Sequence, residues 1–202
     1  MWTRDSTSSA LAVSPPASEF PLVGPAVAAG CAATATAAVA TGHVVAAPVT
    51  AVAFVVAGTA IVDARTMRIP NRLIVFGAAL AGLGAVAVSV GDHRPLLEVV
   101  GAGAIGWMFS GAPLMILLWV VRPASIGGGD WKLLTVAGIT IGFAGPFAAA
   151  LVFVIAATVQ LVQASLLGRR RDLPLGPGLF AGYCVAAAAA LTFNDLLGGV
   201  YQ

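Results

Sequence analysis

Long apolar stretches dominate this sequence and restrict what it can fold into. They run for about 17–25 residues, the length that an α-helix needs to cross a hydrocarbon core, and they do not alternate apolar with polar residues as a membrane β-barrel would. The 202 residues are 59% hydrophobic and only 9% charged, whereas about a quarter of a soluble domain is charged. The mean hydropathy is +0.99. The sequence therefore predicts an all-α, polytopic integral membrane protein.

The apolar runs predict a bundle of about seven transmembrane helices. Only Gly42-His43 separates the first two runs, so we expect a tight hairpin there. Pro146 marks either a turn after the short fifth run or a kink within one longer segment. The expected spans are residues 22–42, 44–62, 73–90, 96–121, 132–144, 147–168 and 178–197.

The start of the chain differs from the rest in composition. Residues 1–21 are polar and rich in Ser, Thr and Pro, which predicts a disordered tail. The first apolar run follows a long polar lead whose sole basic residue is Arg4, so we interpret this run as an anchor and not as a cleaved signal peptide. We therefore expect an extra N-terminal transmembrane helix at 22–43 and a membrane-embedded domain at 44–202 that contains six helices.

The basic residues predict the orientation in the membrane. With these spans, nine of the ten Lys and Arg residues fall on one side, and only Arg94 falls on the other. Loops that carry Lys and Arg face the cytoplasm, so we expect a cytoplasmic N-terminus and a C-terminus outside. The nine residues are Arg4, Arg65, Arg68, Arg72, Arg122, Lys132, Arg169, Arg170 and Arg171.

Two aspartates stand where apolar runs meet the predicted cytoplasmic side. Asp63 closes the second run, and Asp130 follows three glycines just before the fifth. An ionisable residue at membrane depth is costly and is a functional-site hypothesis by default. Two carboxylates brought together share a proton and so supply an acid and a base at one site. The alternative is that both are ordinary polar residues that mark helix ends.

The position of each aspartate on its helix suggests how the two differ. Asp63 lies near the negative end of a helix dipole and Asp130 near the positive end of another, so our hypothesis is that Asp63 holds the shared proton and Asp130 is ionised. The glycines before Asp130 remove side-chain bulk, which lets a substrate strand or the opposing helix approach closely.

The run from Gly127 to Lys132 has the pattern GxGDxK, and Asp63 is followed by a basic stretch and Ile69-Pro70-Asn71. A third stretch, Pro174-Leu175-Gly176-Pro177, precedes the last apolar run. Together the three stretches resemble the type IV prepilin peptidases, which are membrane-embedded aspartic proteases of the GxGD type. The third stretch differs from the Pro-Phe-Gly-Pro of that family in that Leu175 replaces the aromatic residue. The resemblance covers about residues 45–197.

The resemblance implies an aspartic endopeptidase of the bacterial or archaeal cytoplasmic (inner) membrane. It would cleave the short basic leader of prepilin or pseudopilin substrates at the cytoplasmic face, before their hydrophobic helix. Asp63 and Asp130 would be the two catalytic residues, and no metal or cofactor is implied. Trp131 is the candidate for substrate contact because it follows Asp130. The matching motif positions with structural or supporting roles are Gly127, Gly129, Lys132, Pro70 and Asn71.

The chain departs from the classical enzymes of this family, which carry a cytoplasmic domain with paired CxxC motifs and also methylate the new amino terminus. Its two cysteines, Cys31 and Cys184, are each alone within a predicted span. It therefore looks like the short, peptidase-only subgroup associated with tight-adherence (Flp-type, Tad) pili, and we expect no N-methylation. The expected partners are the pilin substrate, the lipid bilayer and the pilus assembly machinery, and no nucleic acid.

A small proton-coupled transporter is the main alternative from another class, because intramembrane carboxylates can also relay protons. A carrier would place them near the bilayer midplane, whereas we expect both at cytoplasmic ends of spans. Inverted repeats, which would support a carrier, are not visible. A zinc protease would need HExxH, which the sequence lacks.

Overall fold

The computed structural model describes residues 23–66, 68–121, 127–167 and 174–196, and within these ranges the regular structure is entirely α-helical. The predicted disordered tail and the arginines Arg122 and Arg169–Arg171 lie outside the described residues. The predicted all-α fold is confirmed. The helices are α1 (Val23–Thr41), α2 (Ala46–Thr66), α3 (Asn71–Gly91), α4 (Leu96–Phe109), α5 (Gly111–Val121), α6 (Gly128–Gly142), α7 (Pro146–Leu167) and α8 (Gly176–Leu196).

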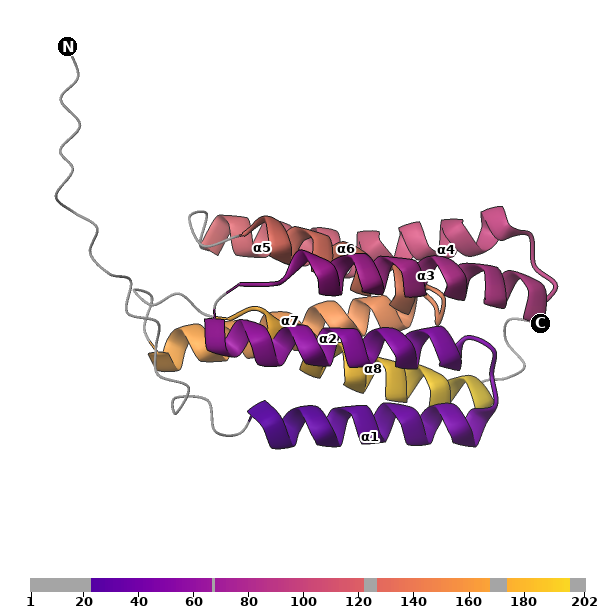
Figure 1. The fold of residues 1–202 in the computed structure, drawn as a ribbon, viewed down its shortest axis with the longest axis horizontal. Helices are drawn as coiled ribbons and strands as arrows, with labels where there is room; N and C mark the ends of the chain where they lie inside the picture. Colours follow the sequence, from indigo (N-terminus) through magenta and orange to yellow (C-terminus); the bar gives the residue numbers. More distant parts are fainter. Residues whose placement is uncertain (1–22, 67, 122–126, 168–173, 197–202) are drawn as a thin grey trace, which may run out of the picture.

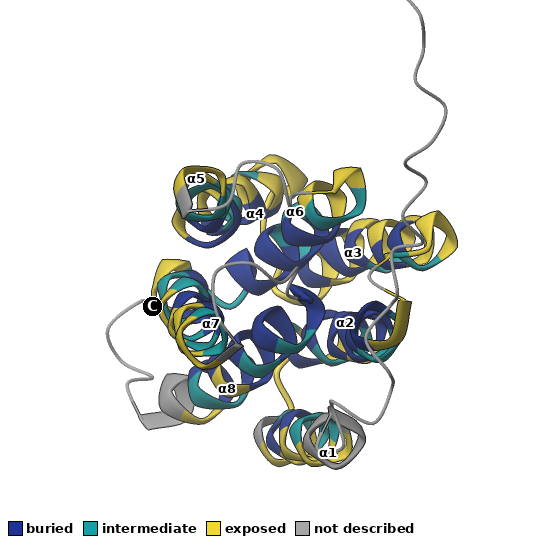
Figure 2. Cartoon of the chain, turned by 90° about the vertical axis from the view of Figure 1, so that its left-hand side faces the viewer, coloured by how far each residue is buried: buried dark blue, intermediate teal, exposed yellow. Residues whose placement is uncertain are grey.

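The helices lie roughly along one axis, and successive helices run in opposite directions, except that α5 continues in the direction of α4 (Figure 1). α2, α5 and α7 end at the same end of the bundle where α3, α6 and α8 begin, and we call this the site end. Seen from the site end, the buried residues face the centre of the bundle and the exposed residues face outward (Figure 2). Many of the outward residues are large and apolar, such as Leu97, Phe147 and Leu166. A surface of this kind suits a lipid environment.

Four helical stretches of the described chain are long and apolar enough to cross a membrane. They are α2, α3, the α4–α5 stretch Leu96–Val120, and α7. Within α1 and α8 the apolar stretches Ala28–Ala40 and Gly176–Thr192 are shorter. α6 has 15 residues and is therefore about 22 Å long, less than a hydrocarbon core of roughly 30 Å. The protein is a polytopic helical membrane protein, and its α6 is shorter than a full membrane span.

The fourth predicted span, 96–121, corresponds to the candidate span Leu96–Val120, but the structure divides it into two helices. The helix is interrupted at Ser110 and resumes as α5. Pro113 explains the interruption, because it has no N–H and its ring crowds the carbonyl group of Phe109 four residues earlier. The Ser110 hydroxyl donates a hydrogen bond of 2.7 Å to the carbonyl oxygen of Gly106. α4 and α5 together thus take the place of one predicted span.

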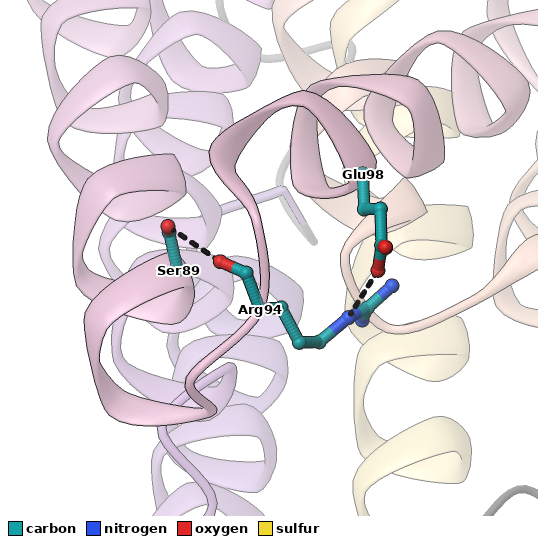
Figure 3. Close-up of polar contacts among 3 residues, drawn as sticks. All are labelled: Ser89, Arg94 and Glu98. Atoms are coloured by element: carbon teal, nitrogen blue, oxygen red, sulfur yellow. Dashed lines mark hydrogen bonds and ion pairs between the residues drawn. The ribbon is translucent and has the colours of Figure 1, made fainter.

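Short turns close the end opposite the site end. The predicted tight hairpin between α1 and α2 is confirmed, and it begins at Gly42, whose φ of +63° favours glycine. Pro146 marks a turn and not a kink, since α6 ends at Gly142 and α7 begins at Pro146. In the turn between α3 and α4 the Ser89 hydroxyl donates a hydrogen bond to the Arg94 carbonyl oxygen, and the Arg94 side chain forms an ion pair with Glu98 (Figure 3).

Glycines let the helices approach closely. A Cβ added to Gly106 of α4 would overlap the Cα of Gly142 in α6 and lie 2.6 Å from the carbonyl oxygen of Gly138. A Cβ on Gly182 of α8 would lie 2.7 Å from the Val152 carbonyl oxygen in α7. Such close backbone packing is how helices associate in lipid, where apolar burial does not drive them together.

α1, the predicted extra helix, lies at the edge of the bundle and packs against α2 and α8 (Figure 2). The main hydrophobic core is formed by α2, α6, α7 and α8, with fully buried members such as Val52, Leu133, Val152 and Leu179. The boundary between an extra helix at 22–43 and a peptidase domain at 44–202 stays a prediction.

Candidate active site

Asp63 lies in the last turn of α2, and only 4% of it is exposed. Its Oδ2 accepts a hydrogen bond of 2.8 Å from the backbone N–H of Gly176, and the N–H of Leu175 makes a weaker interaction. Gly176 is the first residue of α8, so the carboxyl faces the positive end of that helix dipole. The end of α2 and the beginning of α8 therefore meet at Asp63.

This contact depends on the absence of a side chain at Gly176. A Cβ there would lie 2.7 Å from the Cα of Ala60 and 3.2 Å from the Cβ of Asp63. Glycine lets the start of α8 lie against α2, so that its N–H reaches the carboxylate. Pro177, the next residue, is tolerated because N–H groups in the first helical turn have no partner within the helix.

Asp130 is the third residue of α6 and lies before the buried apolar part of that helix, which starts at Leu133. Its Oδ2 accepts a hydrogen bond of 2.9 Å from the backbone N–H of Gly127. In a capping box the side chain of the third helical residue accepts from the N–H of the residue before the helix, and Asp130 does this with Gly127. Burial raises the pKa of Asp130 above its ordinary value of 3.8, and the hydrogen bond from Gly127 partly offsets this rise.

The two aspartates lie at the same end of the bundle, where α2 ends and α6 begins, and the charge of Asp130 acts on the Asp63 carboxyl group. The segments around them also touch. A Cβ on Gly129 would lie 3.0 Å from the Cβ of Ile69, and the Lys132 ammonium donates a hydrogen bond of 3.3 Å to the Asn71 side-chain oxygen. Two segments about sixty positions apart in the sequence thus lie against each other at the site.

Pro70 stands at the start of α3, where its extended backbone (φ −66°, ψ 128°) turns the chain from the basic loop into the helix. Its carbonyl oxygen accepts a hydrogen bond from the N–H of Leu73 at 3.1 Å. Proline is well placed here because its fixed φ suits the turn and it needs no partner for an N–H. Pro70 therefore has a structural role, which is to direct the chain into α3 at Asn71.

The three glycines before Asp130 have different surroundings. Gly129 packs against the backbone of Ile69, as described above. A Cβ on Gly128 would meet nothing within 4 Å, and one on Gly127 would lie 3.5 Å from the Asp130 carboxylate. Gly129 therefore serves the contact between the two motifs, whereas a side chain at Gly128 would have room.

Trp131 is 46% exposed, and its ring packs edge-on against Trp107 of α4, with 6.1 Å between ring centroids and 79° between ring planes. The Trp107 indole nitrogen is buried with no hydrogen-bond partner among the described residues. The sequence does not single out Trp107, because aromatic residues in apolar spans are usually packing residues. The pair links the residue after Asp130 to the fourth predicted span.

Gln160 is a further polar residue near the site that sequence reasoning missed. It lies on α7, is 8% exposed, and donates from Nε2 to the carbonyl oxygens of Pro174 at 3.1 Å and Leu175 at 3.4 Å. A glutamine inside an apolar span needs hydrogen-bond partners, and this is the signal that could have identified it. Among the described residues, no group of three or more His, Cys, Asp or Glu side chains is placed to hold a metal ion.

The fold and the site define a polytopic helical membrane protein with two interacting carboxyl groups near one end of the bundle. A sequence model of the type IV leader peptidase family matches residues 49–162, more than half of the chain. The chain belongs to this family, and it is a membrane-integrated leader peptidase of the prepilin type, as the resemblance implied. Comparison with curated proteins and comparison with solved structures each found no match.

The matched region contains both aspartates and runs from α2 into α7. α1 and α8 lie outside it, and α8 is the helix whose first residue, Gly176, donates to Asp63. The match therefore covers the two carboxyl groups but not every part of the protein that holds them.

Proposed function

We propose that this peptidase is an aspartic endopeptidase in which Asp63 and Asp130 activate a water molecule against the peptide bond that joins a prepilin leader to its hydrophobic helix. The observation that carries the proposal is the contact between the two motif segments, through Gly129 with Ile69 and Lys132 with Asn71. Asp63 comes from the end of α2 and Asp130 from the start of α6, and the charge of Asp130 acts on the Asp63 carboxyl group. A pair of this kind holds one proton between its members more readily than none.

In the proposed reaction the ionised carboxylate takes a proton from water while the neutral carboxyl donates a hydrogen bond to the scissile carbonyl oxygen. The hydroxide equivalent then adds to the carbonyl carbon and forms a tetrahedral intermediate. The C–N bond breaks as a proton passes to the leaving amine, and the pair returns to its singly protonated form. Each step needs one acid and one base within hydrogen-bond reach of the substrate.

The surroundings of the pair support these roles. The backbone N–H of Gly176 orients Asp63, and that of Gly127 orients Asp130. Gly129 and the Lys132–Asn71 hydrogen bond join the two motif segments. The open space at Gly128 suits an extended leader strand beside Asp130, with Trp131 as the candidate substrate contact.

The charges of the described residues support a cytoplasmic site. Arg65, Arg68, Arg72 and Lys132 are exposed near the site end, which the positive-inside rule assigns to the cytoplasm. We therefore propose a cytoplasmic (inner) membrane location with the site at the cytoplasmic face. We further propose a pilin substrate of the tight-adherence type, contact with the pilus assembly machinery, and cleavage without N-methylation.

The test is leader processing in cells that co-express the chain with a candidate prepilin. Asp63→Asn and Asp130→Asn keep the shape of each side chain and remove its acid–base function, so each should lower processing by roughly 10²–10⁴-fold. Asp92→Asn, at the opposite end of the bundle, is the matched control and should process normally. Normal processing by either site variant would exclude the aspartic mechanism.

A proton-coupled carrier is the second candidate, since the same carboxyl pair could relay protons. Purified protein in liposomes distinguishes the two functions. Proton flux that Asp63→Asn abolishes, together with an absence of prepilin cleavage, would favour the carrier.

A further inference from the structure

We propose that Gln160 is a positioning residue for Asp63, which it serves by holding the turn that leads into α8. Gln160 belongs to α7, the helix before that turn, and its side chain is more than nine-tenths buried. Its amide nitrogen donates to two successive carbonyl oxygens, at 3.1 Å from Pro174 and 3.4 Å from Leu175. The inference rests on the proposed function, because it assigns Gln160 a role through the catalytic carboxyl group.

The chain of contacts from Gln160 to Asp63 is short. Gln160 binds the carbonyl groups of Pro174 and Leu175, and the next backbone N–H, that of Gly176, donates to Asp63 Oδ2 at 2.8 Å. Each peptide plane is rigid, so fixing these two carbonyl directions restricts the direction of the N–H that follows. Gln160 therefore sets where the donor to Asp63 points.

Other described groups of the turn also bear on this geometry, among them the Leu175 N–H, which interacts with Asp63. Pro174 has no N–H to donate. The Leu175 carbonyl oxygen also accepts the first hydrogen bond of α8, from the N–H of Leu179 at 3.1 Å. The side chain of Leu175 is buried in the main core, which locates the turn but does not orient its carbonyl groups.

Space for the Gln160 amide is provided by another glycine of α8. A Cβ on Gly178 would lie 3.0 Å from Gln160 Nε2, so a larger residue there would push the amide away from the turn. Gly176 and Gly178 lie two positions apart. Gly176 leaves room for α2 at Asp63, and Gly178 leaves room for α7 at Gln160. The start of α8 is thus held from both neighbouring helices.

The test compares Gln160→Leu with Gln163→Leu in the full-length protein, using prepilin cleavage in lipid nanodiscs. Gln163 lies one turn further along α7, and its side-chain oxygen is buried with no hydrogen-bond partner among the described residues, so its replacement removes no contact of that oxygen. Gln160→Leu should weaken the hydrogen bond from the Gly176 N–H to Asp63. We therefore expect kcat to fall roughly tenfold or more, as for the loss of one hydrogen bond to a charged group, with little change in KM. Gln163→Leu should match the wild type.

The pH–rate profile separates positioning from a merely structural role. If Gln160 acts through Asp63, the residual activity of Gln160→Leu should show a profile displaced to higher pH, because the carboxylate form loses a donor. A lower unfolding temperature with an undisplaced profile would overturn the proposal, and so would wild-type kcat in Gln160→Leu.

A second variant covers the case in which Gln160→Leu fails to fold. Gln160→Glu keeps the volume, and its carboxyl group can donate one hydrogen bond while it is protonated. We expect cleavage to be rescued at low pH and lost as the new carboxyl ionises, beyond the loss seen in the wild type. An unchanged profile for Gln160→Glu would refute the inference, whereas cleavage by Asp63→Asn would instead refute the proposed function.

Discussion

The substitution Gly176→Ala tests most sharply how the protein holds Asp63. The new Cβ would lie 2.7 Å from the Cα of Ala60, whereas carbon atoms in contact prefer about 3.5–4.0 Å. The neighbour is backbone, so no flexible side chain can move aside. The start of α8 must therefore retreat from α2 by roughly 1 Å.

The expected cost has two parts. Overpacking of this kind destabilises a protein by about 1–3 kcal/mol. The same retreat lengthens the bond from the Gly176 N–H to Asp63, now 2.8 Å, to roughly 3.8 Å, beyond hydrogen-bond range. Loss of a hydrogen bond to a charged group is worth about 1.5–3 kcal/mol, and if this bond stabilises the transition state more than the ground state, its loss lowers kcat by up to about 10- to 100-fold.

The assay is single-turnover cleavage of a prepilin by purified protein in nanodiscs, with thermal unfolding measured on the same samples. Gly58→Ala is the matched control, because it lies on α2 and its Cβ would meet nothing within 4 Å. It should cleave normally and, as a helix-interior glycine, gain up to about 1 kcal/mol of stability. Wild-type kcat in Gly176→Ala would refute the proposed role of the N–H in orienting Asp63.

Three further predictions follow from the same geometry. Because burial raises the pKa of Asp130 above 3.8, the acid limb of a bell-shaped kcat/KM profile should lie above that pH; an acid limb at or below it would contradict the participation of this carboxyl group in the reaction. Gly129→Ala, whose Cβ would lie 3.0 Å from that of Ile69, should lower kcat several-fold, while Gly128→Ala, which meets no neighbour within 4 Å, should keep the folded stability and alter chiefly KM. Equal kinetics for the two alanine variants would show that the motif contact does not matter. Gly106→Ala should destabilise the α4–α6 contact by about 1–3 kcal/mol, and an unchanged unfolding temperature would show that these helices can separate without cost.

The helices were largely predictable because the physics that places them is local. Long apolar runs can only be helices in a bilayer, and the turn at Pro146 stood among the expected alternatives. The interruption at Ser110 was not predicted, although Pro113 is visible in the sequence. Whether a proline kinks, ends or spares a membrane helix depends on which neighbours satisfy the freed backbone groups, and the contact of the Ser110 hydroxyl with Gly106 is known only from the fold.

The two aspartates were predictable for a different reason, namely the scarcity of charge in an apolar chain. The groups that orient Asp63 were not predictable. The N–H of Gly176 is 113 positions away along the chain, and Gln160 reaches its turn only when α7 and α8 pack together. No spacing rule reports such contacts.

The dipole argument about the shared proton also needs revision. The hypothesis that Asp63 holds the proton places Asp63 at the negative end of α2 and Asp130 at the positive end of α6. The positive end of α8 lies against the same carboxyl group, so two helix ends of opposite sign act on Asp63. Helix dipoles alone therefore do not assign the proton, and the pair is better treated as one titrating unit.

The most direct test of the account is a double-mutant cycle on prepilin leader cleavage with Asp63→Asn, Asp130→Asn and the variant that combines them. Residues that act as one unit lose nearly all activity when either is removed, and little more when both are. We therefore predict that each single variant cleaves as slowly as the double variant. Normal cleavage by either single variant, or losses that multiply in the double variant, would contradict the claim that Asp63 and Asp130 form one catalytic pair.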